Sequence, residues 1–262
     1  PFAVVTGKPI AIGGSLGREK ATGQGVVNVL REMLPDLDIP IDDMRVSILG
    51  FGNVGSWAGR ILYDMGANIV AVMDHTGALR NDEGLDAHAL AEHCAQHGGV
   101  AGFEKRHAAT GSGKHTGQGA TLISEDEYWS TPSDVFIPAA LEGMVTEDRA
   151  KQLHTRVVAE AANAPTTPEG DKVLAGRGIE VIPDMLCNAG GVTVSYFEWV
   201  QNRSNVTWDV DQVDRELNRI MCMAARRTIV ARQKYEIDMR TAAYVASLEH
   251  LGDIYLNRGI WP

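Results

Sequence analysis

The chain has 262 residues, of which 44% are hydrophobic and 22% are charged, the proportions of a globular protein with a buried core. Its formal net charge is −10, so its surface repels phosphate backbones and anionic membranes, which argues against nucleic-acid and membrane partners. No apolar run is long enough to span a bilayer as a helix.

The three cysteines, Cys94, Cys187 and Cys222, are widely spaced and form no C-x-x-C pair. This pattern indicates neither a disulfide framework nor a zinc site, so we expect free thiols and a cytoplasmic location. The chain opens with P-F-A-V-V-T-G-K-P and without a methionine, which we interpret as the beginning of a piece of a longer polypeptide.

A glycine-dense segment, Gly13–Val26, precedes the first predicted strand. If a helix begins near Ser15, Arg18 and Thr22 lie four positions apart on one of its faces. We therefore predict a glycine-rich N-terminal helix that presents these two side chains together.

From residue 46 onward, short β-branched runs alternate with helix-length amphipathic segments. The predicted strands are Val46–Leu49, Ile69–Met73, Asp134–Pro138, Arg156–Glu160 and Glu180–Ile182. The predicted helices are Asn53–Met65, Asp86–His97, Thr146–His154 and Pro168–Gly176. This alternation is typical of an α/β protein, and we predict a Rossmann-type, doubly wound, mostly parallel sheet with helices on both faces.

After the last strand the pattern changes to two long helices that follow each other. Asp209–Ile237, with Asp209 as its N-cap, and Met239–Asn257 form a predicted C-terminal helical hairpin. We expect residues 1–207 to form the Rossmann core with its N-terminal helix, and residues 208–262 to pack on that core.

The sequence V-S-I-L-G-F-G-N-V-G carries a G-x-G-x-x-G motif at Gly50, Gly52 and Gly55. A predicted strand leads into the motif, and a predicted helix follows it and ends at Gly66, a residue suited to the C′ position. Asp74 closes the next strand, 22 residues after Gly52. Together these features indicate a dinucleotide site; the alternative is a structural turn with Asp74 as an ordinary loop acid.

Each glycine of the motif has its own expected role. Gly50 permits the tight turn, Gly52 allows the backbone to approach a pyrophosphate, and Gly55 allows the helix to pack on the strand. The phosphates would meet the free N–H groups at the start of that helix. The expected phosphate-binding stretch comprises Gly50, Phe51, Gly52, Asn53, Val54 and Gly55.

Asp74 bears on the choice of cofactor. Its carboxylate would accept hydrogen bonds from the adenosine ribose and repel a 2′-phosphate, which favours NAD over NADP. A protonated His75 beside it would offset the repulsion, although an exposed loop histidine is the simpler interpretation. We therefore expect NAD as the cofactor and leave NADP open.

A second distinctive segment is N-A-G-G-V-T-V-S-Y-F-E-W at Asn188–Trp199. As a helix it would place Asn188, Val192, Ser195 and Trp199 in one stripe. Most such stripes face a core, but a stripe that contains an amide and a hydroxyl is better suited to a ligand. The two glycines in its first turn would let another group approach closely.

Four segments of the chain resemble those of glutamate dehydrogenases. They are Gly13–Val26, Leu49–Gly55, A-E-A-A-N-A-P-T-T-P-E-G at Ala159–Gly170, and Asn188–Trp199. The resemblance extends over essentially the whole chain, and the G-G-S-L-G-R element favours glutamate dehydrogenase over its leucine, valine and phenylalanine relatives. It implies an NAD(P)-dependent enzyme that oxidatively deaminates L-glutamate to 2-oxoglutarate and ammonia.

The resemblance implies cofactor contacts outside the glycine loop. Arg18 and Thr22 resemble residues that face the nicotinamide amide. Asn163 and Asn188 resemble the amides beside the nicotinamide and its ribose. Asn163 is also open to interpretation as a turn residue ahead of Pro165.

The resemblance likewise implies two pairs of lining residues. Ala139 and Ala140 resemble a backbone stretch that lines the dinucleotide groove. Val192 and Ser195 resemble the pair that lines the pocket for the substrate side chain and its carboxylate.

The catalytic lysine and aspartate of glutamate dehydrogenases belong to a domain upstream of the one that this chain resembles, and no residue here matches them. We therefore assign no catalytic residue and expect the chain to bind cofactor without turnover. A free-standing, non-catalytic NAD-binding or regulatory subunit is the alternative. The family is hexameric, so we expect a homo-oligomer for the full-length enzyme.

Two other groups have simpler interpretations. Gly98–Gly119 lacks periodicity and is predicted to be a loop, and Lys114 within it fails the P-loop pattern. His93 and His97 lie four apart on a predicted helix, but no third ligand is spaced to join them. We expect a solvated histidine face and no metal.

Overall fold

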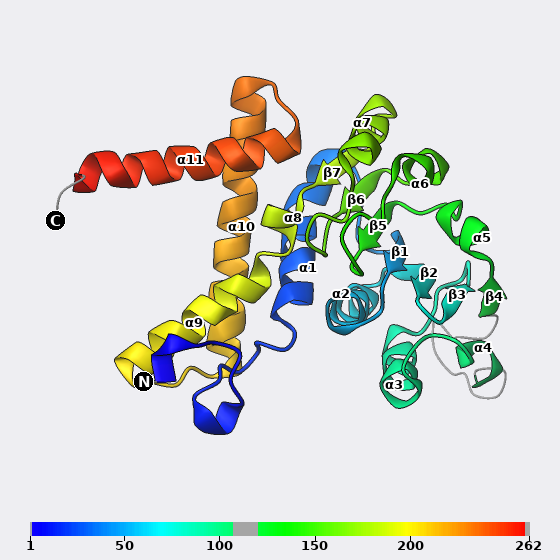
Figure 1. The fold of residues 1–262 in the computed structure, drawn as a ribbon, viewed down its shortest axis with the longest axis horizontal. Coiled ribbons are helices and arrows are strands. Elements are labelled where there is room, and N and C mark those ends of the chain that lie inside the picture. Colours follow the sequence, from blue (N-terminus) through cyan, green and yellow to red (C-terminus); the bar gives the residue numbers. More distant parts are fainter. Residues whose placement is uncertain (1, 107–119, 260–262) are drawn as a thin grey trace.

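The computed structural model describes residues 2–106 and 120–259, which form a seven-stranded sheet between two layers of helices (Figure 1). The strands are β1 (Arg45–Leu49), β2 (Asn68–Asp74), β3 (Gly77–Arg80), β4 (Thr121–Ile123), β5 (Val135–Pro138), β6 (Val157–Ala159) and β7 (Glu180–Ile182). Their order is β4-β3-β2-β1-β5-β6-β7. The five predicted strands pair in parallel, which confirms the predicted sheet, whereas β3 and β4 pair antiparallel.

Alternate side chains along β1 pack against opposite helix layers. One layer contains α1 (Ala21–Met33), α2 (Asn53–Asp64) and α3 (Ala87–His97), and the other contains α5 (Glu125–Trp129), α6 (Glu147–Gln152) and α7 (Pro168–Gly176). Ile48 of β1 packs in the first layer and Leu49 in the second. Burial of each such side chain contributes about 1.5–3 kcal/mol, so a strand that is apolar throughout requires helices on both faces.

The sequence does not predict β3 or β4. The β3 sequence, G-A-L-R, has four residues and no β-branched side chain. β4 has three residues, pairs with β3 alone among the described strands, and leaves Leu122 57% exposed. Because such short edge strands bury little apolar surface, their sequences lack the alternation that marks longer strands.

The N-terminal helix begins at Ala21, so the predicted start near Ser15 is wrong. Residues 16–20 form a turn in which Gly17 has a φ of +74°, a conformation that favours glycine. Arg18 therefore lies in this turn and not on the helix.

The glycines inside α1 allow neighbouring helices to approach closely. A Cβ on Gly23 would lie 2.7 Å from the backbone nitrogen of Ala58 in α2. A Cβ on Gly25 would lie 2.8 Å from the Cα of Gly190. The glycine density of the N-terminal segment therefore reflects helix packing, with α1 lying between the sheet layer and the C-terminal helices.

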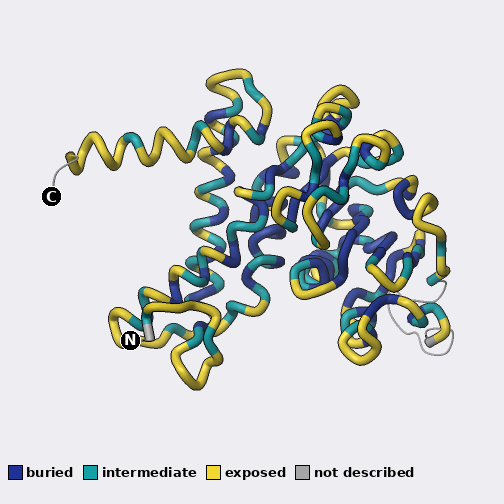
Figure 2. Tube along the Cα trace, in the orientation of Figure 1, coloured by how far each residue is buried: buried dark blue, intermediate teal, exposed yellow. Residues whose placement is uncertain are grey.

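Four helices complete the C-terminal part of the chain: α8 (Asp184–Cys187), α9 (Gly190–Ser204), α10 (Val210–Tyr235) and α11 (Met239–Arg258). The Asp209 carboxylate accepts a hydrogen bond from the backbone of Gln212, which confirms the predicted N-cap. α10 packs on α1 and α9, as expected for helices that cover the core. α11 crosses the end of α10 and projects from the body, where its outer part is exposed (Figure 2).

The predicted loop at Gly98–Gly119 contains a short helix, α4 (Phe103–Arg106), in its described part. Residues 107–119, which include Lys114, lie outside the described residues. The 3-10 helices of the described ranges are η1 (Phe2–Val4), η2 (Ile10–Ile12) and η3 (Leu34–Leu37). Among these described elements, none combines the length and the apolar character that a membrane-spanning helix needs.

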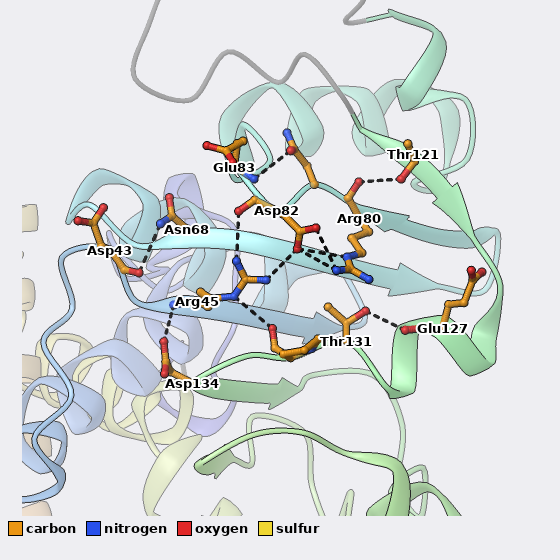
Figure 3. A network of polar contacts seen from close by, with 12 residues as sticks. Asp43, Arg45, Asn68, Arg80, Asp82, Glu83, Thr121, Glu127, Thr131 and Asp134 are labelled. Atoms are coloured by element: carbon orange, nitrogen blue, oxygen red, sulfur yellow. Dashed lines mark hydrogen bonds and ion pairs between the residues drawn. The ribbon is translucent and has the colours of Figure 1, made fainter.

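Ion pairs close the edge of the sheet at which the parallel strands begin (Figure 3). The Arg45 backbone N–H donates to Asp134 Oδ2 at 2.9 Å, and the Arg45 guanidinium donates to Asp82 Oδ1 at 2.8 Å. Arg80 donates to the same Asp82 carboxylate, and these hydrogen bonds, that of Arg45 foremost, lower its pKa. The carboxyl ends of the parallel strands lie at the opposite edge of the sheet.

Candidate functional site

The glycine motif forms the predicted tight turn between β1 and α2. Gly50 has a φ of +89°, and a Cβ there would lie 2.8 Å from Ala140. A Cβ on Gly55 would lie 2.0 Å from the Gly50 carbonyl oxygen. A Cβ on Gly52 would meet no atom of the described residues within 4 Å. Gly50 and Gly55 are thus required by the protein itself, whereas Gly52 faces open space at the N-terminus of α2.

A cleft of about 910 Å³ lies beside this turn, at the carboxyl ends of β1, β2 and β5. β1 lies between β2 and β5, so the chain connections diverge to opposite sides at this point of the sheet. Doubly wound sheets bind ligands at such a switch point. The predicted site residues that line the cleft are Gly50, Phe51, Gly52, Asn53, Asp74, Ala139 and Ala140, and His75 lines it beside them.

Three residues of the loop use their side chains within the protein. Phe51 is 4% exposed and packs near Gly59. Asn53 Nδ2 donates to the Glu19 carbonyl oxygen at 3.0 Å, which ties α2 to the N-terminal turn. Val54 is half-buried against the core. Packing therefore occupies the Phe51 and Val54 side chains, whereas Asn53 is exposed and lines the cleft.

Asp74 has structural partners that the sequence does not reveal. Its Oδ1 accepts hydrogen bonds from the Thr76 backbone at 2.8 Å and the Thr76 hydroxyl at 2.6 Å. Its Oδ2 accepts one from the Val100 backbone at 3.0 Å. Burial raises the pKa of the neighbouring Cys94 thiol to about 11, and the Asp74 charge adds to that effect. Asp74 therefore lines the cleft and also holds two segments of its wall.

Arg149 of α6 is a cleft residue that the sequence analysis missed. It donates to Glu125 Oε1 at 2.5 Å and to the Met144 carbonyl oxygen at 3.0 Å. Its guanidinium carbon also lies 4.9 Å from the ring centroid of Trp129. These contacts fix Arg149 as a wall of the cleft, with its charge paired to Glu125.

A second group of predicted residues lies where the N-terminal turn meets α9. Arg18 Nε donates to Ser195 Oγ at 3.0 Å. A Cβ on Gly191 would lie 2.5 Å from Thr22 Oγ1 and 3.7 Å from Arg18 Nη1. The structure therefore brings Arg18, Thr22 and Ser195 together, although Arg18 precedes α1.

Asn163 and Asn188 lie side by side, with Asn188 Nδ2 donating to Asn163 Oδ1 at 2.8 Å. Asn188 follows the last residue of α8 and precedes α9. The prediction that it belongs to the helical stripe is therefore wrong. Val192 and Trp199 of that stripe are 69% and 42% exposed. This face of α9 is consequently not a core face.

The histidine pair of α3 differs from the expectation. His93 is 3% exposed, so the predicted solvated face is wrong for this residue. Its ring stacks on His97 with 4.3 Å between centroids, and its Nε2 donates to the Ala101 carbonyl oxygen at 2.9 Å. Within residues 2–106 and 120–259, no group of three or more His, Cys, Asp or Glu side chains is arranged to hold a metal ion.

Comparison with known proteins gives the same family throughout. The family model described as Glutamate/Leucine/Phenylalanine/Valine dehydrogenase matches residues 13–259. Glutamate dehydrogenase from Thermotoga maritima is 40% identical over 262 residues, which are 100% of this chain and 60% of that protein. NADP-specific glutamate dehydrogenase A1 from Halobacterium salinarum is 41% identical over 99% of this chain and 59% of that protein.

Solved structures agree with these sequence relatives. The hetero-hexameric glutamate dehydrogenase from Thermus thermophilus, in a leucine-bound form, has a TM-score of 0.85 and 29% identity, over 99% of this chain and 58% of that chain. Glutamate dehydrogenase from Peptoniphilus asaccharolyticus has a TM-score of 0.80 and 33% identity, with the same coverage. The chain spans about 60% of the length of the relatives that it matches. The glycine turn, the cleft and these similarities agree, and the chain belongs to the glutamate, leucine, phenylalanine and valine dehydrogenase family.

Proposed function

We propose that this chain is the dinucleotide-binding portion of an NAD(P)-dependent glutamate dehydrogenase. The observation that carries the proposal is the open space at Gly52, at the edge of the cleft and at the N-terminus of α2. A diphosphate fits such a cradle because it accepts hydrogen bonds from the free N–H groups of the first helical turn. The family membership and the names of the relatives support glutamate as the substrate.

When bound, the nicotinamide cofactor accepts the hydride that leaves L-glutamate during its oxidative deamination to 2-oxoglutarate and ammonia. The residues of this chain hold and orient the two reactants. In our proposal, the diphosphate rests on Gly50–Gly55, the adenosine ribose on Asp74, and the groove backbone is that of Ala139 and Ala140. The nicotinamide side is held by Arg18, Thr22, Asn163 and Asn188, and the substrate side by Val192 and Ser195.

Asp74 supports NAD as the preferred cofactor, because its carboxylate lies in the cleft and repels a 2′-phosphate. Its hydrogen bonds to Thr76 and Val100 fix the direction of the carboxylate. A relative with 41% identity is named as NADP-specific, so preference must be measured for this chain directly.

Four broader proposals follow from the fold, the cysteines and the relatives. Residues 1–207 act as the Rossmann core and residues 208–262 as helices that cover it, supported by the packing of α10 on α1 and α9. The catalytic lysine and aspartate lie in a part of the enzyme that this chain does not contain. The full enzyme is an oligomer, which is supported by a relative whose name calls it a hetero-hexamer. That it is a homo-oligomer is our own proposal, taken from the sequence resemblance. A cytoplasmic location is supported by three free cysteines.

Calorimetric titration of the chain with NADH and with ADP tests the proposal. We expect both ligands to bind, because ADP contains the adenosine and diphosphate that the cleft receives. We also expect no oxidation of glutamate by the 262-residue chain alone. The absence of binding heat and of any thermal shift with either ligand would refute the dinucleotide site, and turnover would refute the assignment of the catalytic groups to another part.

A further inference from the structure

Asp184, at the start of α8, connects the two amide residues on the nicotinamide side. Its Oδ2 accepts a hydrogen bond from the Ala164 backbone at 2.7 Å, directly after Asn163. Its carbonyl oxygen accepts one from the Asn188 backbone at 2.9 Å. One aspartate therefore fixes the backbone next to Asn163 and that of Asn188, whose side chains are hydrogen-bonded to each other.

The Asn163 loop needs such support. Ala164 has a φ of +43°, a left-handed conformation that is unfavourable for a non-glycine residue. Asn163 and Ala164 are both exposed, so packing does not hold this conformation in place. Besides the bond that the Ala164 N–H donates to Asp184, two backbone bonds hold the loop. The Gly143 N–H donates to the Ala164 carbonyl oxygen at 2.9 Å, and the Val145 N–H donates to the Pro165 carbonyl oxygen at 2.8 Å.

Asp184 is in turn held by a buried ion network. Glu160 directly follows β6 and is 0% exposed, and its Oε2 accepts a hydrogen bond from the Asp184 backbone at 2.9 Å. The Arg240 guanidinium donates to both oxygens of Glu160 at 2.9 Å each, and it lies 3.9 Å from Asp184 Oδ1. A bidentate pair of this kind fixes direction as well as distance.

The same network joins the site to the base of α11, since Arg240 is the second residue of that helix. Arg240 also donates to Asp171 of α7 at 2.9 Å. Burial lowers the pKa of Arg240, but its hydrogen bonds to Glu160 and Asp171 outweigh burial and raise it overall. The guanidinium therefore stays charged and keeps Glu160 paired.

We propose that Asp184 is a positioning residue for the nicotinamide side of the site, and that Glu160 and Arg240 hold it in place. The inference rests on the proposed function, because it assumes that the Asn163–Asn188 pair contacts the nicotinamide or its ribose. Asp184 touches neither reactant; it sets the distance and orientation of the two amides.

The variant Asp184→Asn tests this inference in the 262-residue chain. Asp184 accepts hydrogen bonds on both carboxylate oxygens, from Met185 and from Ala164, and an asparagine can satisfy only one of them. We expect the dissociation constant for NADH to rise at least fivefold and that for ADP to stay within twofold. ADP is the internal control because it lacks the nicotinamide and its ribose.

A double-mutant cycle with Asn163→Ala shows whether Asp184 acts through the amide pair. We expect Asp184→Asn to have no further effect on NADH affinity once Asn163 is alanine, since coupled residues are not additive. Glu180→Gln is the matched control: it breaks an ion pair with Arg232 that ties the end of α10 to β7, without touching Asp184. It should leave both affinities unchanged.

Several outcomes would overturn the inference. A variant that weakens ADP and NADH equally would indicate a general structural role, and independent effects of the two substitutions would exclude action through Asn163. If Asp184→Asn does not fold, Arg240→Lys provides the same comparison, because lysine keeps the charge but loses the bidentate contact. A wild-type chain that binds ADP and NADH equally tightly overturns the positioning role alone, whereas one that binds neither overturns the proposed function as well.

Discussion

Gly52 and Gly55 provide a matched pair of substitutions that separates a role in binding from a role in folding. Gly52 has a φ of −75° and a ψ of −153°, which alanine also adopts, and a Cβ there meets no atom within 4 Å in the part of the chain that the structure describes. A Cβ on Gly55 lies 2.0 Å from the Gly50 carbonyl oxygen and 3.1 Å from the Gly50 carbonyl carbon. The same added methyl group is thus tolerated at one position and clashes with backbone at the other.

These geometries give distinct stability changes. For Gly52→Ala, the lower entropy of the unfolded chain stabilises by about 0.4–1 kcal/mol, and the loss of glycine at the N-cap offsets most of it, so the net change is within about 0.5 kcal/mol. For Gly55→Ala, overpacking costs about 1–3 kcal/mol, and contact with backbone places it at the upper end. At about 2–4 °C per kcal/mol, Tm should fall by roughly 4–12 °C for Gly55→Ala only.

For ligand affinity, in contrast to stability, Gly52→Ala should be the variant with the large effect. The methyl group of Gly52→Ala occupies the space in which we place the diphosphate, so the dissociation constant for ADP should rise about tenfold, or about 1.4 kcal/mol. Differential scanning calorimetry and isothermal titration on the same samples measure both quantities. If Gly52→Ala keeps its Tm and binds ADP as tightly as the wild type does, the diphosphate does not rest on this turn and the reasoning fails.

Three further predictions concern single carboxylates and a hydroxyl. Asp74→Ser should lower the preference for NADH over NADPH, and an unchanged affinity ratio would count against the ribose role. The same variant loses the hydrogen bonds that Thr76 donates to Asp74, so the free energy of unfolding should fall by about 1 kcal/mol per hydrogen bond. Ser195→Ala, in the complete glutamate-oxidising enzyme, should raise KM for glutamate far more than KM for NAD, and equal effects would remove Ser195 from the substrate pocket. Burial raises the pKa of Glu198, but hydrogen bonds from Lys8 and the neighbouring backbone outweigh it, so the pKa is lowered overall. The stability that Glu198 contributes is therefore fully present at a pH above its ordinary pKa of 4.5, and it is lost as the pH falls through the lowered pKa. Amide exchange at Lys8 should become faster over the same pH range. The variant Glu198→Gln should abolish this pH dependence.

The features that the sequence predicts well are those set by local chemistry. The central strands are apolar because both faces are buried, and this signal needs no knowledge of partners. The predicted helix cap at Asp209 forms because its carboxylate accepts a hydrogen bond from the Gln212 backbone. The glycine turn is recognisable in the sequence because its backbone requires glycine at fixed positions. Gly50 has a positive φ, and a side chain at Gly55 would clash with the backbone of Gly50.

The features that the sequence does not predict depend on residues far apart in the chain. Arg240 lies 80 positions from Glu160, and nothing near either residue indicates the other. The structural bonds of Asp74 reach Val100, 26 positions away, and the burial of His93 depends on Phe103 packing against its ring. One local signal was available: Glu160 is an acid placed directly after a buried strand, where an unpaired charge is too costly to leave without a partner.

The net charge of the chain governs the binding of an extended polyanion, whereas local geometry governs the binding of a single diphosphate. A net charge of −10 repels an extended polyanion, because many phosphates must approach the surface together and feel its average field. A single diphosphate is held by N–H groups within hydrogen-bonding distance, far shorter than the screening length of about 8 Å at physiological ionic strength. The first turn of α2 supplies such groups beside Gly52, where no side chain intervenes. An acidic chain can therefore exclude nucleic acid as a class and still bind one dinucleotide at one helix terminus.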